Sequence, residues 1–205
     1  MNEQEHWENV YLNNQPEKMG WYRPELETSL NWIKEFQPDR DARIIDVGGG
    51  ASTLVDGLLA EGYSSITVAD LSKTALELTR KRLSEKADAV TWLAGDISVL
   101  ELPSSAYHLW HDRAAFHFLT TEDERQKYLD QLKKALKPSG HLIMATFSPE
   151  APPRCSGLKV ERYTPYRLEG VLGPEFILKR DIKELHVTPG GVEHMYLYCC
   201  FQRTG

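Results

Sequence analysis

Short apolar runs alternate with longer amphipathic segments through the first half of the chain. The runs 44–47, 65–69 and 90–94 are short and rich in branched apolar residues, which is typical of buried parallel strands. Between them, residues 53–61 and the segment that follows Ser72 place apolar side chains at helical spacing. Ser72 is also a good N-cap residue for the second of these helices. The alternation predicts strand–helix–strand units.

The second half of the chain continues this alternation and then leaves it. Residues 107–112 and 141–147 are strand-like, and the amphipathic segment 121–137 between them is predicted to be helical. Two long β-rich runs follow, 175–187 and 192–203, joined by a Thr-Pro-Gly-Gly turn typical of a hairpin. The whole pattern predicts an α/β fold: a doubly wound, mostly parallel seven-stranded sheet with a C-terminal antiparallel β-hairpin.

A glycine loop follows the first predicted strand directly. Gly48, Gly49 and Gly50 stand between strand and helix, where backbone N–H groups and a helix N-terminus can approach a ligand closely. Asp46 precedes the loop, and Thr53 occupies the place where a dinucleotide fingerprint has its third glycine. A carboxylate beside the loop repels a pyrophosphate and favours a ligand that carries positive charge. A plain tight turn in another α/β protein is the alternative.

This stretch resembles the first motif of the class I S-adenosylmethionine-dependent methyltransferases, in which an acid and Gly-x-Gly follow the first strand. The resemblance implies that Asp46 lies near the methionine ammonium group of the cofactor, S-adenosylmethionine. It also implies that Gly48, Gly49 and Gly50 lie under the cofactor. The resemblance extends from Ile44 to the C-terminus, and its motifs are specific for the cofactor rather than for the methyl acceptor.

Acids also stand at the ends of the next two predicted strands. Asp70 lies 20 residues after Gly50, the distance at which an acid at the second strand tip accepts hydrogen bonds from ribose hydroxyls. A helix-capping carboxylate is the alternative for this residue. In the resembling family an acid at the position of Asp96 meets the adenine amino group. We therefore predict that Asp70, Leu71, Asp96 and Ile97 bind the cofactor.

Two histidines lie at the end of the predicted fourth strand and just after it, near the crevice where an open parallel sheet binds ligands. Methyl transfer from a sulfonium mainly needs alignment, and it needs a base only if the acceptor starts protonated. Because imidazole titrates near neutral pH, His111 and His117 are the candidate catalytic residues. His111 is also counted among the residues that contact the cofactor. A structural histidine, hydrogen-bonded within its loop, is the alternative for each.

An aromatic segment precedes the predicted helix 24–36. In related enzymes such a segment folds over the methionine end of the cofactor, so the resemblance places Trp21, Tyr22 and Tyr11 at the cavity. Aromatic faces suit a sulfonium cation. A hydrophobic clasp on the sheet edge is the alternative for these residues.

A second candidate cover is the loop 149–165, which is longer than most loops without a function. It contains Cys155, for which the alternatives are a redox or acceptor-side thiol and an inert loop cysteine. We divide the chain into an N-terminal lid segment and helix, residues 1–36, and a methyltransferase domain, residues 37–205. Together they form a single domain.

The composition of the chain limits the kinds of partner and compartment that we expect for the protein. The formal net charge of −6 argues against a nucleic-acid substrate, because phosphates require a basic face. The sequence has no run of transmembrane length and no signal-peptide pattern, so we expect a cytoplasmic protein with no membrane partner. Three cysteines agree with a reducing compartment, and the neighbours Cys199 and Cys200 are predicted to pack on opposite faces of a strand. No metal site is predicted.

These observations lead to one functional prediction with three alternatives. We expect an S-adenosylmethionine-dependent methyltransferase that acts on a small-molecule acceptor by in-line methyl transfer. The alternatives are a protein-lysine methyltransferase, a nicotinamide-dependent oxidoreductase, and a non-catalytic cofactor-binding domain. Asp46 and Thr53 argue against the nicotinamide enzyme. The accepting atom and the oligomeric state stay open.

Overall fold

The computed structural model of the protein describes residues 2–204. Its α-helices are α1 (Glu3–Asn13), α2 (Glu27–Phe36), α3 (Leu54–Ala60), α4 (Lys73–Leu83), α5 (Glu122–Ala135) and α6 (Pro165–Leu172). Its strands are β1 (Ile44–Val47), β2 (Ile66–Asp70), β3 (Val90–Ala94), β4 (Tyr107–Arg113), β5 (Leu136–Phe147), β6 (Arg154–Cys155), β7 (Leu158–Lys159), β8 (Phe176–Val187) and β9 (Glu193–Arg203). Within the described residues, no helix has the length and apolar character needed to cross a membrane.

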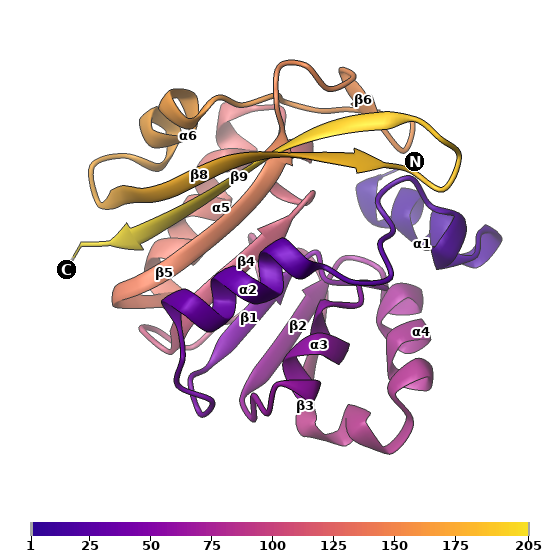
Figure 1. The fold of residues 1–205 in the computed structure, drawn as a ribbon, viewed down its shortest axis with the longest axis horizontal. Coiled ribbons are helices and arrows are strands. Elements are labelled where there is room, and N and C mark those ends of the chain that lie inside the picture. The colour runs from indigo at the N-terminus through magenta and orange to yellow at the C-terminus, as the bar shows by residue number, and fades with distance from the viewer. Residues whose placement is uncertain (1, 205) are drawn as a thin grey trace.

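Seven strands form one sheet in the order β3-β2-β1-β4-β5-β9-β8. The first five strands run parallel, and β9 pairs antiparallel with both β5 and β8. This confirms the predicted α/β fold with its doubly wound, mostly parallel sheet and C-terminal hairpin (Figure 1). The strand order reverses between β1 and β4, so the carboxyl ends of these two strands flank the crevice in which such sheets bind ligands.

Helices cover both faces of the sheet. Successive side chains of each strand point to opposite faces, so neighbouring residues pack in different layers. Ile44 and Cys200 belong to the apolar layer that also contains residues of α2, α3 and α4. Their neighbours Ile45 and Cys199 belong to the layer that contains residues of α5 and α6. The placement of the two cysteines in opposite layers confirms the prediction that both serve packing.

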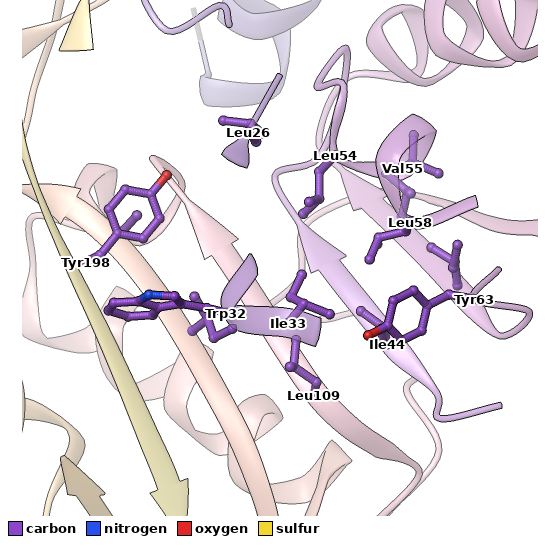
Figure 2. Packing of buried hydrophobic residues seen from close by; sticks show 14 of the residues in the cluster. Leu26, Trp32, Ile33, Ile44, Leu54, Val55, Leu58, Tyr63, Leu109 and Tyr198 are labelled. Carbon is purple, nitrogen blue, oxygen red and sulfur yellow. The ribbon is translucent and has the colours of Figure 1, made fainter. Parts of the chain in front are cut away.

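Helix α2 is amphipathic, and its buried face is held on the sheet by large side chains. Figure 2 shows Trp32 and Ile33 directed toward Leu109 of β4 and Tyr198 of β9. The rings of Trp32 and Tyr198 meet edge-to-face, with their centroids 5.9 Å apart. Burial of a side chain of this kind contributes roughly 1.5–3 kcal/mol. Ser29 is the polar exception on this face, fully buried and close to the site described below.

The N-terminal segment contains a helix that the hydrophobic pattern did not reveal. Helix α1 begins with a capping box, in which Asn2 accepts from the backbone of Glu5 and the Glu5 side chain accepts from Asn2. The signal was present in the sequence as an Asn followed three residues later by Glu. Tyr11 of α1 and Met19 pack with Ala51 and other residues in a third, smaller apolar cluster. α1 therefore lies against the glycine loop and α4.

Several predicted boundaries were wrong by a few residues. The predicted helix 24–36 begins only at Glu27, because the backbone at Leu26 has a ψ of 65°, which is outside the helical region. The predicted helix 121–137 ends at Ala135, and β5 begins at Leu136 rather than at residue 141. A residue before proline avoids the helical region, so Lys137 leaves the helix and joins the strand. The loop 149–165 contains the short antiparallel pair β6 and β7.

Candidate functional site

The glycine loop after β1 has no room for side chains at Gly48 and Gly49. Gly48 has a φ of +68°, and a Cβ on it would lie 2.5 Å from the Cβ of Ala115. A Cβ on Gly49 would lie 2.5 Å from Oδ2 of Asp46 and 2.8 Å from Cγ1 of Val68. The loop backbone is therefore packed directly against β1, β2 and the segment after β4, at the point where the strand order reverses.

A cavity of about 280 Å³ opens at this point. The residues predicted for the cofactor that line it are Asp46, Gly48, Gly49, Asp70, Leu71, Asp96, Ile97, His111 and Trp21. Gly50, Tyr22 and His117 are not part of its lining. The structure thus brings together acids from three successive strand ends in one cavity, as the sequence suggested.

Asp46 and His111 form a buried pair at the floor of the cavity. Nδ1 of His111 donates to Oδ1 of Asp46 over 2.7 Å, since a carboxylate can only accept. Nε2 of the same ring lies 2.9 Å from the hydroxyl oxygen of Ser29. Both ring nitrogens are therefore engaged, whereas Oδ2 of Asp46 is buried without a hydrogen-bond partner. The free carboxylate oxygen matches a ligand that offers an N–H donor.

Asp70 stands at the tip of β2 and accepts the backbone N–H of Ser72 over 2.8 Å. Burial raises the pKa of Asp70 to about 7, although the hydrogen bond from Ser72 opposes this shift. The cap of α4 is made by the Ser72 hydroxyl, which accepts from the backbone N–H of Ala75. Asp70 therefore makes a local hydrogen bond and also lines the cavity. A role near the start of α4 is compatible with a role in ligand binding.

His117 lies behind the cavity wall and is fully buried. Its Nδ1 accepts the backbone N–H of Phe147 over 3.3 Å. Burial and the nearby Arg113 lower the pKa of His117 to about 3, so this ring is neutral near pH 7. A catalytic role for either histidine stays a prediction. His111 has no free ring nitrogen and His117 does not face the cavity, so this geometry argues against both as general bases.

The segment after β4 is fixed by Asp112. This carboxylate accepts from the backbone N–H groups of Ala115 and Phe116 and from the hydroxyl of Tyr128. Tyr128 in turn accepts the indole N–H of Trp110 over 2.8 Å. Burial raises the pKa of Asp112 to about 6. The network holds the backbone that meets the glycine loop.

Aromatic residues of the N-terminal segment cover the cavity. Trp7, Tyr11 and Trp21 all line it. The centroid of Trp7 lies 5.1 Å from that of Phe118, and the centroid of Tyr11 lies 6.0 Å from that of Trp21. Trp7 was not predicted for the site, and its spacing of four residues from Tyr11 within α1 was the signal that could have found it.

Arg113 at the end of β4 is a wall residue whose importance the sequence did not show. Its Nε donates to the Tyr198 hydroxyl over 3.0 Å, and Nη1 donates to the carbonyl of Trp21 over 3.0 Å. The guanidinium carbon lies 4.4 Å from the centroid of Tyr196. Ser29 was missed as well, although a serine on the apolar face of a predicted amphipathic helix is a recognisable signal.

Comparison with known proteins agrees with this site. Residues 44–140 match the family model described as "Methyltransferase domain". The eEF1A lysine and N-terminal methyltransferase of Bos taurus is 24% identical over 139 residues, covering 68% of this chain and 20% of that protein. The malonyl-(acyl-carrier protein) O-methyltransferase of Halalkalibacterium halodurans is 34% identical over 116 residues, covering 55% of this chain and 41% of that protein. The chain spans less than half the length of either relative.

The fold extends this similarity to nearly the whole chain. The solved structure of an S-adenosylmethionine-dependent methyltransferase from Anabaena variabilis aligns with a TM-score of 0.73 at 15% identity, covering 99% of this chain and 96% of that one. The sheet order and the acid-flanked glycine loop agree with this match to a methyltransferase domain. Over residues 44–140 the chain matches the methyltransferase family, and over nearly its whole length it has the fold of a solved S-adenosylmethionine-dependent methyltransferase.

The residues that line the cavity fit S-adenosylmethionine as a cofactor. The unpartnered Oδ2 of Asp46 offers an acceptor to an ammonium group, and the side-chain-free backbone at Gly49 lies directly beside it. Asp70 and Asp96 line the same cavity further along the strand ends. The described residues contain no group of three or more His, Cys, Asp or Glu side chains arranged to hold a metal ion.

Proposed function

We propose that this protein transfers a methyl group from S-adenosylmethionine to a small-molecule acceptor. The observation that supports a small acceptor is the cover of the cavity by Trp7, Tyr11 and Trp21. A cavity with such a cover admits a compact molecule more readily than a segment of another protein. The net charge of −6 also argues against nucleic acid as the substrate.

The cofactor supplies a methyl group already activated on a sulfonium sulfur, so the chain's own residues provide alignment and exclude water. In our proposal Asp46, oriented by His111, accepts the ammonium group, and Asp70 accepts the ribose hydroxyls. Asp96 meets the adenine amino group. The aromatic cover then keeps water from the sulfonium and holds the acceptor in line with it.

Protein-lysine methylation is the second candidate. It is favoured by the relative from Bos taurus, whose name gives eEF1A lysine and the N-terminus as its targets. A lysine acceptor would have to enter the cavity past α1 and the loop that contains Cys155. We propose a reducing compartment such as the cytoplasm for either activity, supported by three free, buried cysteines.

Methyl-labelled cofactor distinguishes the two acceptor classes. The purified protein is incubated with labelled S-adenosylmethionine and with either a small-molecule filtrate or the retained proteins of the same cell extract. We expect the label to appear in the small-molecule fraction and to be absent with Asp46→Asn. Label found only on protein would support the lysine candidate. Cofactor binding without transfer to either fraction would indicate a non-catalytic domain.

A further inference from the structure

One end of the cavity carries a positive charge that no carboxylate of the described residues neutralises by a direct ion pair. Arg113 makes two hydrogen bonds to neutral oxygens, those of Tyr198 and Trp21, and no salt bridge within residues 2–204. Its Nη2 nitrogen is buried and has no hydrogen-bond partner. A buried donor on a cation is costly to leave unpaired, because it has lost water without gaining an acceptor.

The other cationic side chain at this end is already neutralised. Arg23 lines the cavity too, but its guanidinium is paired with Glu184, which also accepts the hydroxyl of Thr28. Glu184 is therefore occupied by two donors. Lys127, the third cation of the lining, pairs with Asp123, so among the described lining residues Arg113 is the cation without a carboxylate partner.

Apart from Glu184, whose charge acts on the guanidinium without an ion pair, the groups around Arg113 are neutral. The pKa values of His117, His186 and His194 are lowered by burial, and Arg113 lowers each of them further. All three rings are therefore neutral near pH 7. Tyr196 lies under the guanidinium, and its hydroxyl is also buried without a hydrogen-bond partner.

Two of the acids that line the cavity, Asp70 and Asp96, lie away from Arg113. Asp70 and Asp96 stand after β2 and β3, whereas Arg113 stands at the end of β4, on the opposite side of β1 in the sheet. Cys155, which lies beside Arg113 in the lining, carries no charge, because burial raises its thiol pKa to about 11. Arg113 is thus separated from Asp70 and Asp96 by β1, whose Asp46 is hydrogen-bonded to His111.

We propose that Arg113 binds a carboxylate on the methyl acceptor, so that the acceptor is a small organic acid rather than a neutral molecule. The inference rests on the proposed function, since it names the substrate class of the same site. Two donors of a guanidinium match the two oxygens of a carboxylate, and the unpartnered Nη2 supplies the free one. Because Nη1 also holds the carbonyl of Trp21, the acceptor's anchor is tied directly to the aromatic cover.

Binding to the complex with S-adenosylhomocysteine tests the inference without the need for turnover. The probes are 4-hydroxybenzoate, 4-aminobenzoate and 4-mercaptobenzoate, each compared with its carboxamide by calorimetry. We expect the carboxylates to bind about 10- to 100-fold more tightly than the carboxamides, the worth of a charge-assisted hydrogen bond. Arg113→Gln is expected to abolish this preference, and Arg113→Lys to retain part of it. Arg154→Gln, which changes an exposed arginine on β6, is the matched control and should retain the preference in full.

Two results would overturn the inference. If no carboxylate binds more tightly than its carboxamide, the free donor of Arg113 does not recognise an acceptor acid. If Arg113→Gln weakens S-adenosylhomocysteine but leaves 5′-methylthioadenosine, which lacks the amino-acid part, unchanged, Arg113 holds the carboxylate of the cofactor instead. Failure of the proposed function gives a different result, in which the unaltered protein binds S-adenosylhomocysteine but transfers no methyl group to any fraction.

Discussion

Asp70 is a buried carboxyl that must be ionised to bind the ligand we propose. It belongs to a buried strand end, where desolvation favours the neutral acid, and in our proposal it must be ionised to accept ribose hydroxyls. The pKa of about 7 in the free protein means that cofactor binding has to remove a proton from this carboxyl below neutral pH. The consequence is a measurable dependence of affinity on pH.

We expect the affinity for S-adenosylhomocysteine to be constant above about pH 8 and to fall as the pH is lowered through 7. Well below 7 the fall approaches tenfold per pH unit, because each binding event must then deprotonate one group. Asp70→Asn should weaken binding at pH 8 by about 1.5–3 kcal/mol, the worth of a hydrogen bond to a charged group, and should remove the pH dependence. Calorimetry at several pH values measures both effects. An unchanged dissociation constant would mean that Asp70 only stabilises the start of α4.

His111 offers a second test at the same scale. Its two ring nitrogens contact Asp46 and Ser29, so we expect His111→Ala to weaken S-adenosylhomocysteine binding by leaving the Asp46 carboxylate misplaced and unpaired. A catalytic base would behave differently. Its loss would lower turnover, leave cofactor affinity intact and remove the limb of the pH–rate profile near the histidine pKa. His117→Gln is the comparison variant, and a loss of turnover there with normal folding would reinstate it as a candidate base.

At the scale of elements, α1 is joined to α4 through one carboxylate. Glu8 accepts the backbone N–H of Lys73 over 2.6 Å and the Ser72 hydroxyl over 3.2 Å, so a side chain of α1 caps the N-terminus of α4. Such caps are typically worth about 1 kcal/mol, and a negative charge is favoured at a helix N-terminus. The capping contact holds the aromatic cover beside the cavity.

We expect Glu8→Gln to loosen α1 from α4, because the amide loses the charge that favours the helix N-terminus. The variant should bind S-adenosylhomocysteine about fivefold more weakly and should be cleaved faster by proteases near the end of α1. Glu17→Gln, which alters an exposed glutamate of the same segment, is the matched control. Equal protease sensitivity of the two variants would show that α1 is held by its apolar contacts alone.

At the scale of the whole molecule, the N-terminal segment contributes little to the two main apolar layers but closes the site. Those layers are built from α2 onward, together with Leu26, whereas α1 contributes to the small third cluster. We expect deletion of residues 1–23 to leave a folded protein and to reduce methyl transfer sharply, because an open cavity admits water. Circular dichroism and the labelled-cofactor assay measure the two effects. Normal turnover by the folded truncated protein would show that the segment is a clasp on the surface.

The sequence alone predicted the order of the seven sheet strands and of α2 to α5, together with the acids at the strand ends, and its resemblance to a known family indicated the cofactor. These features are local: a buried parallel strand is a short apolar run, an amphipathic helix repeats at 3.6 residues, and a glycine loop must follow the strand directly. Because parallel strands end at the same edge of a sheet, Asp46, Asp70 and Asp96 had to meet once the fold was known. Small errors, as at Lys137, came from boundaries where two local preferences compete.

Only the tertiary structure decided which side chains share the cavity and which are kept from it. His111 and His117 are six residues apart in the sequence, yet one pairs with Asp46 at the cavity floor and the other lies behind its wall. The surroundings of Arg113 likewise depend on β9, whose Tyr198 accepts from its Nε and whose Tyr196 lies under its guanidinium. Such facts depend on contacts between residues far apart in the chain. A local pattern contains no information about them, because burial and hydrogen-bond partners are set by packing of the whole molecule.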